Sequence, residues 1–403
     1  MILKDTLRNI VKAQRANLDL SEASIEREAL KQIEVKIPFV IVLSGIRRCG
    51  KSTLLKQLMK RVKDFYYFNF EDTRAVNFEV EDFQKLDEIF LEEYGNKDYY
   101  FFDEIQNVQK WELFVRAILD KKKYIIITGS NASLLSRELG TRLTGRHLRF
   151  ELFPFSYKEF LLLSDKKPNI TSFEEYFTNG GFPEYLKLKK SAILQELLND
   201  ILNRDVAIRH KLRNLKSLRE MALYLLTNVG KEFSYNNLKK TFNLGSTNSA
   251  ISFVSYFEDS YLLFPIPKFD YSLKKQLVNP KKIYSVDNGL TNINSSSFSQ
   301  DKGKLLENLV FISLRKKYKD IFYFQEKGEC DFVIKEGIKI TKAIQVCFDL
   351  NDENKDREIN GLIEALEKFD LNEGIILTYK QEDKFKIKDK KVKVLPVWNW
   401  LLE

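Results

Sequence analysis

Residues 45–52 constrain the fold of this chain more than any other segment. They read Gly45-Ile46-Arg47-Arg48-Cys49-Gly50-Lys51-Ser52. An apolar run of strand length, residues 37–43, precedes them, and residues 53–59 continue with leucines at helical spacing. Two glycines, a lysine and a hydroxyl at this spacing, between a strand and a helix, are typical of a loop that cradles phosphates. We therefore predict a nucleotide-binding α/β domain here.

Each residue type in this loop has a chemical role. Glycines let backbone N–H groups turn toward phosphate oxygens, and a helix that begins near Gly50 adds the positive end of its dipole. Lys51 would reach the terminal phosphates, and the hydroxyl of Ser52 would join the Mg²⁺ shell. We expect ATP and Mg²⁺ as cofactors, with Thr53 and the loop residues from Gly45 onward in contact with the nucleotide. The alternative is a glycine-rich turn with a solvated lysine.

A second apolar run ends in two acids. Residues 99–102 are four aromatic residues, and Asp103 and Glu104 follow them. Asp103 can hold the Mg²⁺ shell, and Glu104 can orient or activate an attacking water. By itself this pattern fits any strand end. Because one strand separates it from the phosphate loop, we interpret the pair as the second half of the same site.

Polar residues also follow the next buried strand, residues 124–128. Ser130 and Asn131 lie just past its end, where a side chain could bond the γ-phosphate or the attacking water. The alternative is a turn with a helix cap. Strands that alternate with helices through residue 150 predict a parallel sheet covered on both faces, with these strand ends at one edge.

A glycine-bounded loop, residues 140–147, carries Arg142 and Arg146. An arginine in such a loop can stabilise charge on a transferring phosphoryl group, within its own chain or from a neighbouring subunit. In the second case the active protein would be a homo-oligomer. The alternative is a pair of surface arginines in a turn.

Together these segments resemble a known family. The similar segments are Gly45 to Ser52, Phe102-Asp103-Glu104-Ile105-Gln106, Thr128-Gly129-Ser130-Asn131, Gly145-Arg146, residues 152–160 and Gly180-Gly181-Phe182-Pro183. The chain is similar over nearly its whole length to AAA-type ATPases of archaea and bacteria, members of the AAA+ superfamily catalogued as predicted ATPases. The resemblance implies an ATPase core, a winged-helix domain and a C-terminal restriction-endonuclease-like domain. Ile46 is a departure, because many relatives carry proline there.

The length of 403 residues fits several domains better than one. We expect four segments with different roles. They are a helical lead-in over 1–36, an AAA-type P-loop core over 37–190, a helical and winged-helix domain over 191–290, and an α/β restriction-endonuclease-like domain over 300–403.

Composition narrows the class of protein. Hydrophobic residues make up 44% and charged residues 31%, which is typical of a folded chain with a charged surface. No run approaches the roughly 20 apolar residues of a membrane span, and residues 1–6 lack a signal-peptide core, so we expect a cytoplasmic protein without a membrane partner. Three cysteines and two histidines, at no metal-ligand spacing, argue against a zinc site. The net charge of +9 fits nucleic acid contact without proving it.

Residues 234–265 have the pattern of a helix, a turn, a second helix and an extended arm, which is typical of a winged helix. Its natural partner is duplex DNA, with Ser246, Thr247 and Asn248 facing a groove. Five lysines near the wing would face phosphates: Lys268, Lys274, Lys275, Lys281 and Lys282. Many winged helices instead bind a protein partner or brace an ATPase.

The last hundred residues hold an incomplete nuclease pattern. A metal-dependent nuclease of the restriction type needs a helix carboxylate, an Asp at a strand start and, on the next strand, an acid or amide one residue from a lysine. Glu307, Asp331 and Gln345 fill the first three roles, but Cys347 stands at the lysine position. A neutral thiol cannot replace an ammonium group. We predict a degraded or much weakened nuclease with a vestigial site, or a structural domain or binding platform.

Three functional hypotheses follow. The leading one is an AAA-type ATPase whose nucleotide state controls DNA or partner binding by the C-terminal half. The second is a metal-dependent DNA nuclease regulated by ATP. The third is a protein-interaction scaffold that binds nucleotide without turnover.

Overall fold

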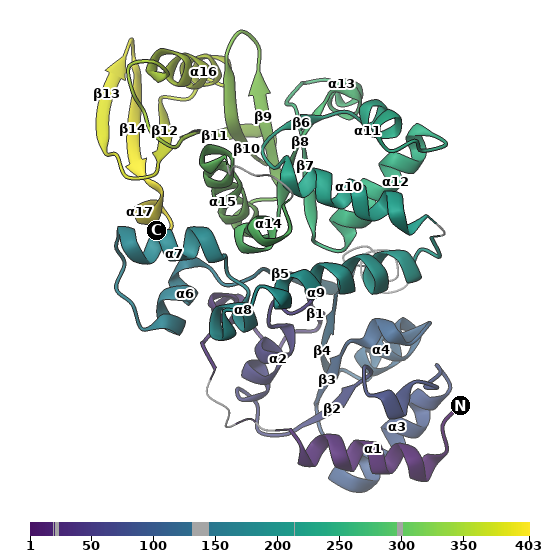
Figure 1. The fold of residues 1–403 in the computed structure, drawn as a ribbon. Coiled ribbons are helices and arrows are strands. Elements are labelled where there is room, and N and C mark those ends of the chain that lie inside the picture. The colour runs from purple at the N-terminus through teal and green to yellow at the C-terminus, as the bar shows by residue number, and fades with distance from the viewer. Residues whose placement is uncertain (19, 21–23, 131–144, 213, 296–300) are drawn as a thin grey trace. The chain divides into compact units, whose positions relative to one another are not determined.

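The computed structural model describes residues 1–18, 20, 24–130, 145–212, 214–295 and 301–403. These residues form two compact units, Met1–Phe153 and Pro154–Glu403 (Figure 1). Within the described ranges, no helix combines the length and apolar character that a membrane span requires. The finer division into four segments stays a prediction.

A parallel sheet lies at the centre of the first unit. In the described part of the chain it has five strands in the order β2-β3-β4-β1-β5, and every neighbouring pair is parallel. The strands are β1 (Val40–Gly45), β2 (Phe65–Asn69), β3 (Tyr99–Asp103), β4 (Tyr124–Gly129) and β5 (His147–Leu152). This is a P-loop NTPase fold, which confirms the α/β prediction for this part of the chain.

Helices connect these strands and cover the sheet. They are α1 (Lys4–Ala16), α2 (Lys51–Met59), α3 (Asp82–Tyr94) and α4 (Trp111–Asp120), with short 3₁₀ turns η1 (Glu28–Gln32), η2 (Thr73–Ala75) and η3 (Ile105–Asn107). Helix α2 packs against β1, β3 and β4, whereas α1 packs against β2 and α3.

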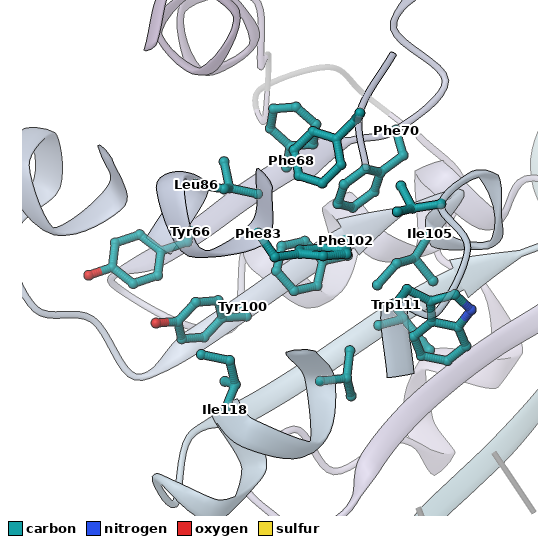
Figure 2. Packing of buried hydrophobic residues seen from close by; sticks show 14 of the residues in the cluster. Tyr66, Phe68, Phe70, Phe83, Leu86, Tyr100, Phe102, Ile105, Trp111 and Ile118 are labelled. Atoms are coloured by element: carbon teal, nitrogen blue, oxygen red, sulfur yellow. The ribbon is translucent and has the colours of Figure 1, made fainter. Parts of the chain in front are cut away.

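An aromatic cluster joins β2 and β3 to helices α3 and α4. Tyr66 and Phe68 are two residues apart in β2, so their side chains face the same side of the sheet. There they belong to the same buried cluster as Phe102 of β3. Figure 2 shows these rings with Phe83 of α3 and Trp111 of α4. Removing one such buried ring typically costs about 3–5 kcal/mol. The cluster therefore fixes β3, whose last residue is Asp103.

The second unit begins with helices and a small antiparallel sheet. Its first helices are α6 (Tyr157–Ser164), α7 (Ile170–Asn179), α8 (Pro183–Leu188), α9 (Ala192–Asp200), the π-helix η4 (Ile201–Ile208) and α10 (Leu215–Thr227). The next elements are β6 (Glu232–Phe233), α11 (Tyr235–Thr241), α12 (Thr247–Asp259), β7 (Leu263–Pro267), α13 (Leu273–Val278), β8 (Lys281–Ser285) and α14 (Asn288–Asn294). Strands β6, β8 and β7 pair in that order.

Helix α12 has a side-chain cap at its first turn. Ser246 is its N-cap, and its hydroxyl accepts a hydrogen bond from the N–H of Ser249. This bond satisfies one of the free N–H groups at the helix start. Two helices followed by a β-hairpin fit a winged helix, and that assignment stays a prediction.

A mixed sheet and the helices around it complete the second unit. Within the described residues its order is β13-β14-β12-β11-β10-β9. The strands are β9 (Asp320–Gln325), β10 (Glu329–Glu336), β11 (Lys339–Cys347), β12 (Glu373–Thr378), β13 (Asp383–Ile387) and β14 (Lys390–Pro396); the helices are α15 (Lys302–Lys317), α16 (Lys355–Lys368) and α17 (Val397–Trp400). Phe311 of α15 stacks on Phe332, whereas the next residue, Val333, clusters with Leu362 of α16. The two helices therefore cover opposite faces.

The buried carboxylate of Asp287 explains why a glycine occupies position 180. Asp287 caps α14 by accepting the N–H of Leu290 at 2.9 Å, and it also accepts the N–H of Gly181 at 2.6 Å. A Cβ on Gly180 would lie 2.1 Å from the Asp287 carboxylate. Only glycine lets the backbone approach this closely, so the carboxylate joins two segments that are far apart in the sequence.

We expect Asp287→Ala to lower the free energy of unfolding by about 2–4 kcal/mol, because a helix cap is lost and buried N–H groups are left unpaired. Urea unfolding of the full chain, followed by tryptophan fluorescence and circular dichroism, measures the change. Asp301→Ala is the matched control, because Asp301 caps α15 at an exposed position. Equal losses in the two variants would contradict the special role of Asp287.

Candidate functional site

The loop between β1 and α2 depends on its two glycines. A Cβ on Gly45 would lie 2.1 Å from the carbonyl oxygen of Leu152 in β5. Gly50 has a φ of 99°, which L-residues with side chains rarely adopt, and it directly precedes Lys51, the first residue of α2. The N–H groups and the dipole at the start of α2 favour an anion at this position.

The other loop residues divide into buried and outward-facing side chains. Ile46 and Cys49 are buried, and burial raises the pKa of the Cys49 thiol, so it stays neutral. Arg47 pairs with Glu71 at 3.3 Å, and Arg48 is exposed with a left-handed φ of 62°. Thr53 is half-buried in the first turn of α2. The buried side chains of Ile46 and Cys49 therefore fix the loop to the interior of the domain.

Lys51 points back into the loop. Its ammonium group donates to the carbonyl oxygens of Gly45 at 3.2 Å and Ile46 at 3.3 Å. It also lies 3.6 Å from Oε1 of Glu104, and its side chain is only 5% exposed. The loop after β1 and the acids after β3 are thus in direct contact.

Asp103 connects three elements of the site. Its carboxylate accepts hydrogen bonds from the hydroxyls of Ser52, at the start of α2, and Thr128, in β4. The same Thr128 oxygen accepts the N–H of Glu104 at 2.9 Å. Thr128 therefore holds both acids, although the sequence interpretation assigned the polar role after β4 to Ser130 and Asn131. Its position as a polar residue at the end of an apolar strand could have indicated it.

The environment of Asp103 suits a divalent cation. Burial, and then the negative charge of Glu104, raise the pKa of Asp103 to about 6. A cation beside this carboxylate would favour its ionised form. The Ser52 hydroxyl and the Asp103 carboxylate are hard oxygen donors in direct contact, and Mg²⁺ typically takes one or two such protein ligands together with phosphate oxygens. These residues therefore fit Mg²⁺.

Glu104 adopts a strained backbone conformation. Its φ of 52° is left-handed, which is uncommon for a residue with a side chain. Gln106, in η3, donates a hydrogen bond to Oε2 of Glu104, while Oε1 faces Lys51. Strained residues of this kind concentrate at functional sites. The side chain is therefore fixed from both sides at the edge of the sheet.

A buried arginine from outside the motif supports the loop backbone. The guanidinium of Arg27 donates to the carbonyl oxygen of Cys49 at 2.6 Å and to that of Phe153 at 2.7 Å, and the residue is only 2% exposed. Gln57 of α2 accepts the backbone N–H of Arg27 at 3.2 Å. A Cβ on Gly50 would lie 2.9 Å from the guanidinium. No local pattern in the sequence predicts this contact.

The structure describes some of the remaining residues that the sequence predicts for the site, but not all of them. Ser130 is buried, and its hydroxyl has no hydrogen-bond partner in the part of the chain that the structure describes. Arg146 pairs with Asp120, at the end of α4, at 2.9 Å. Asn131 and Arg142 lie outside the described residues. Catalytic roles for these four positions stay predictions.

A second polar cluster lies in the other unit. Glu307 of α15, Asp331 of β10 and Gln345 of β11, which the sequence predicts to form one site, lie together: the N–H of Asp331 donates to Gln345 at 3.1 Å. The ammonium group of Lys282 lies 3.0 Å from Glu307 and 2.9 Å from Asp331. The prediction that Lys282 faces DNA phosphates is wrong, because its side chain is only 2% exposed and points into this cluster.

Two family models match the sequence. A model described as an AAA domain, AAA_14, matches residues 38–161, and a model described as a domain of unknown function, DUF8612, matches residues 170–301. The first match covers the sheet and the loop described above. The second covers the helices and the small sheet that follow.

Full-length relatives occur in an archaeon and a bacterium. The uncharacterized protein MJ1544 of Methanocaldococcus jannaschii is 37% identical over 92% of this chain and 90% of its own length. An uncharacterized protein of Haemophilus influenzae is 30% identical over 95% of this chain and 100% of its own length. Among solved structures, C. elegans PCH-2 is 15% identical with a TM-score of 0.23, over 62% of this chain and 66% of its own length.

We expect Arg27→Met to weaken nucleotide binding about tenfold, because a charge-assisted bond to the loop carbonyl is worth roughly 1.5–3 kcal/mol. Fluorescent nucleotide titration measures the change. Arg61→Met is the matched control, since Arg61 also donates to a backbone carbonyl, that of Ile33, but away from the loop. Recovery in Arg27→Lys would support positioning through the carbonyl, whereas unchanged affinity in Arg27→Met would contradict it.

Proposed function

Because the chain belongs to the same family as MJ1544 and the Haemophilus influenzae protein and carries an AAA domain, we propose that it binds ATP with Mg²⁺ and hydrolyses it. One observation carries the proposal. Lys51 of the loop meets Asp103 and Glu104, the two acids at the end of β3, at one edge of the parallel sheet, although more than fifty residues separate them from Lys51 in the sequence. Nucleotides bind at the carboxyl edge of such sheets.

Each group in the site has a role in phosphoryl transfer. Lys51 and the N–H groups at the start of α2 would bind the terminal phosphates. Ser52 and Asp103 would hold Mg²⁺, which neutralises phosphate charge when bound. Glu104 would orient or deprotonate the attacking water.

Thr128 supports this arrangement without contacting the reacting atoms. Its hydroxyl donates to Asp103 and accepts the N–H of Glu104. One side chain therefore sets the relative position of the metal ligand and the catalytic carboxylate. Ser130, buried beyond the same strand end, is the nearest further candidate for a contact with the γ-phosphate or the water.

Arginines complete the proposal. Developing charge on the γ-phosphate is commonly stabilised by an arginine, from the same chain or from a neighbour. Arg142 and Arg146 are the candidates that the sequence offers. If one of them acts from a neighbouring subunit, the active form is a homo-oligomer.

We expect Lys51→Ala to abolish ATP binding, and Glu104→Gln to retain binding while lowering turnover by about 100-fold or more, because only the transition state needs the carboxylate. Nucleotide titration and phosphate release measure the two effects. Lys60→Ala, an exposed lysine directly after α2, is the matched control. Wild-type turnover in Glu104→Gln would contradict the assignment of Glu104. Binding by the wild-type protein without phosphate release would favour the scaffold hypothesis.

We further propose that nucleotide state is coupled to duplex DNA through the second unit. Ser246 and Asn248 are exposed at the start of α12, and Lys274 and Lys275 are exposed on α13, between the two strands of the hairpin. A polar helix start and nearby lysines are suited to contacts with a DNA groove and its phosphates. A protein partner at the same surface is the alternative.

Duplex DNA should therefore raise ATP turnover, and added salt should weaken the effect, because phosphate contacts release counterions. The double variant Lys274→Glu/Lys275→Glu should lose the stimulation. Lys384→Glu/Lys386→Glu, on the exposed strand β13, is the charge-matched control and should keep it. No stimulation of the wild-type protein would favour a protein partner. DNA length, followed in the same reaction, tests the nuclease hypothesis.

A further inference from the structure

The carboxylates of Glu307, Glu329 and Asp331, which we call the C-terminal carboxylate cluster, already surround a cation. Lys282 extends from β8, and its ammonium group lies 2.6 Å from Glu329, 2.9 Å from Asp331 and 3.0 Å from Glu307. Three carboxylates from α15 and β10 thus surround one buried lysine. A divalent metal in a nuclease of the restriction type would need two of these same carboxylates.

The carboxylate oxygens of this cluster are occupied by other groups of the chain. On Glu307, Oε1 accepts from Lys282 and from the Tyr284 hydroxyl at 2.5 Å, and Oε2 accepts from Lys304 at 2.7 Å. On Asp331, Oδ1 accepts from Lys282, and Oδ2 accepts the N–H of Val346 at 3.0 Å. A metal would have to displace these donors.

The amide of Gln345 is occupied in the same way. Its oxygen accepts the N–H of Asp331, and its nitrogen donates to Glu358 of α16 at 2.6 Å. In the part of the chain that the structure describes, no group of three or more His, Cys, Asp or Glu side chains is arranged to hold a metal. The residues of this site therefore do not fit Mg²⁺.

The charges of Glu307 and Lys282 also argue against a bound Mg²⁺. Burial raises the pKa of Glu307, but Lys282 and Lys304 outweigh it and hold this pKa at about 2. Burial also lowers the pKa of Lys282, but Asp331 and Glu307 outweigh it and hold this pKa well above its ordinary value. Both groups are therefore ionised, and a divalent cation placed between Glu307 and Asp331 would face a fixed positive charge.

Cys347 does not supply the missing nuclease chemistry. Burial raises the pKa of its thiol to about 11, so the group is neutral at physiological pH. The thiol lies 3.3 Å from the carbonyl oxygen of Asp349. It lines a cavity of about 660 Å³ together with Glu307, Asp331 and Gln345. The cavity that would receive a substrate thus presents a neutral sulfur where the lysine is expected.

We propose that the ammonium group of Lys282 is the resident cation of this carboxylate site, which fastens β8 to the C-terminal sheet and does not bind a divalent metal. Strand β8 belongs to the small sheet with β6 and β7. Two of its residues, Lys282 and Tyr284, which face the same side, both bond Glu307, and Tyr284 also stacks on Phe311 of α15 at 4.6 Å. The site is structural, although its residue types are those of a metal centre.

The proposal predicts a gain of metal binding. Lys282→Met removes the internal cation and leaves Glu307 and Asp331 for a divalent ion, so Mn²⁺ affinity should rise at least about tenfold over the wild-type protein. Free Mn²⁺ is measured by electron paramagnetic resonance at pH 8, without nucleotide, in an Asp103→Asn background that removes the carboxylate ligand of the nucleotide site. Adding Asp331→Asn to Lys282→Met should abolish the gain. Lys281→Met, which removes the neighbouring lysine, is the matched control and should bind no Mn²⁺.

A charge-balanced variant covers the case in which Lys282→Met does not fold. Lys282→Met/Glu329→Gln removes one charge of each sign, keeps both metal-type carboxylates and should also gain Mn²⁺ binding and a Mn²⁺-dependent rise in melting temperature. Asp331-dependent Mn²⁺ binding by the chain that retains Lys282 would overturn the proposal. Metal-dependent DNA cleavage that is lost in Lys282→Met would also overturn it, because Lys282 would then be the nuclease lysine.

Discussion

The parallel arrangement of β1, β3 and β4 is the constraint on which the nucleotide site depends. Because these strands end at the same edge, Lys51 after β1, Asp103 and Glu104 at the end of β3, and Thr128 in β4 come within contact distance. The aromatic cluster beneath β2 and β3 fixes the strand that carries both acids. Chemistry at the edge therefore depends on packing in the core.

The nucleotide site and the cluster around Lys282 each hold a buried charge with partners from elsewhere in the chain. Arg27 is paired with backbone carbonyls beneath the loop, and Lys282 is paired with carboxylates. A buried charge without such partners would be strongly destabilising. The two centres differ in the charge that they suit: the start of α2 directs N–H groups and a helix dipole toward an anion, whereas the carboxylate oxygens around Lys282 already accept hydrogen bonds.

Part of this could be predicted from the sequence. The glycine spacing and the apolar strands are local features, and the structure has the loop and the sheet at the expected positions. The interpretation of Lys282 failed because a lysine beside a predicted wing resembles a phosphate contact. Strand alternation offered a hint, since Lys281 and Lys282 are adjacent and must face opposite sides.

The sequence by itself determined the α/β class of the first unit and the place of the loop between β1 and α2, because both depend on periodicity and spacing within a few dozen residues. Only the tertiary structure decided that Thr128 holds both acids, that Arg27 supports the loop, and that Lys282 fills the C-terminal carboxylate site. These contacts join Asp103 to Thr128, Arg27 to Cys49 and Lys282 to Asp331, which lie 25, 22 and 49 positions apart. Their formation depends on burial and charge pairing in the folded chain, which no local pattern encodes.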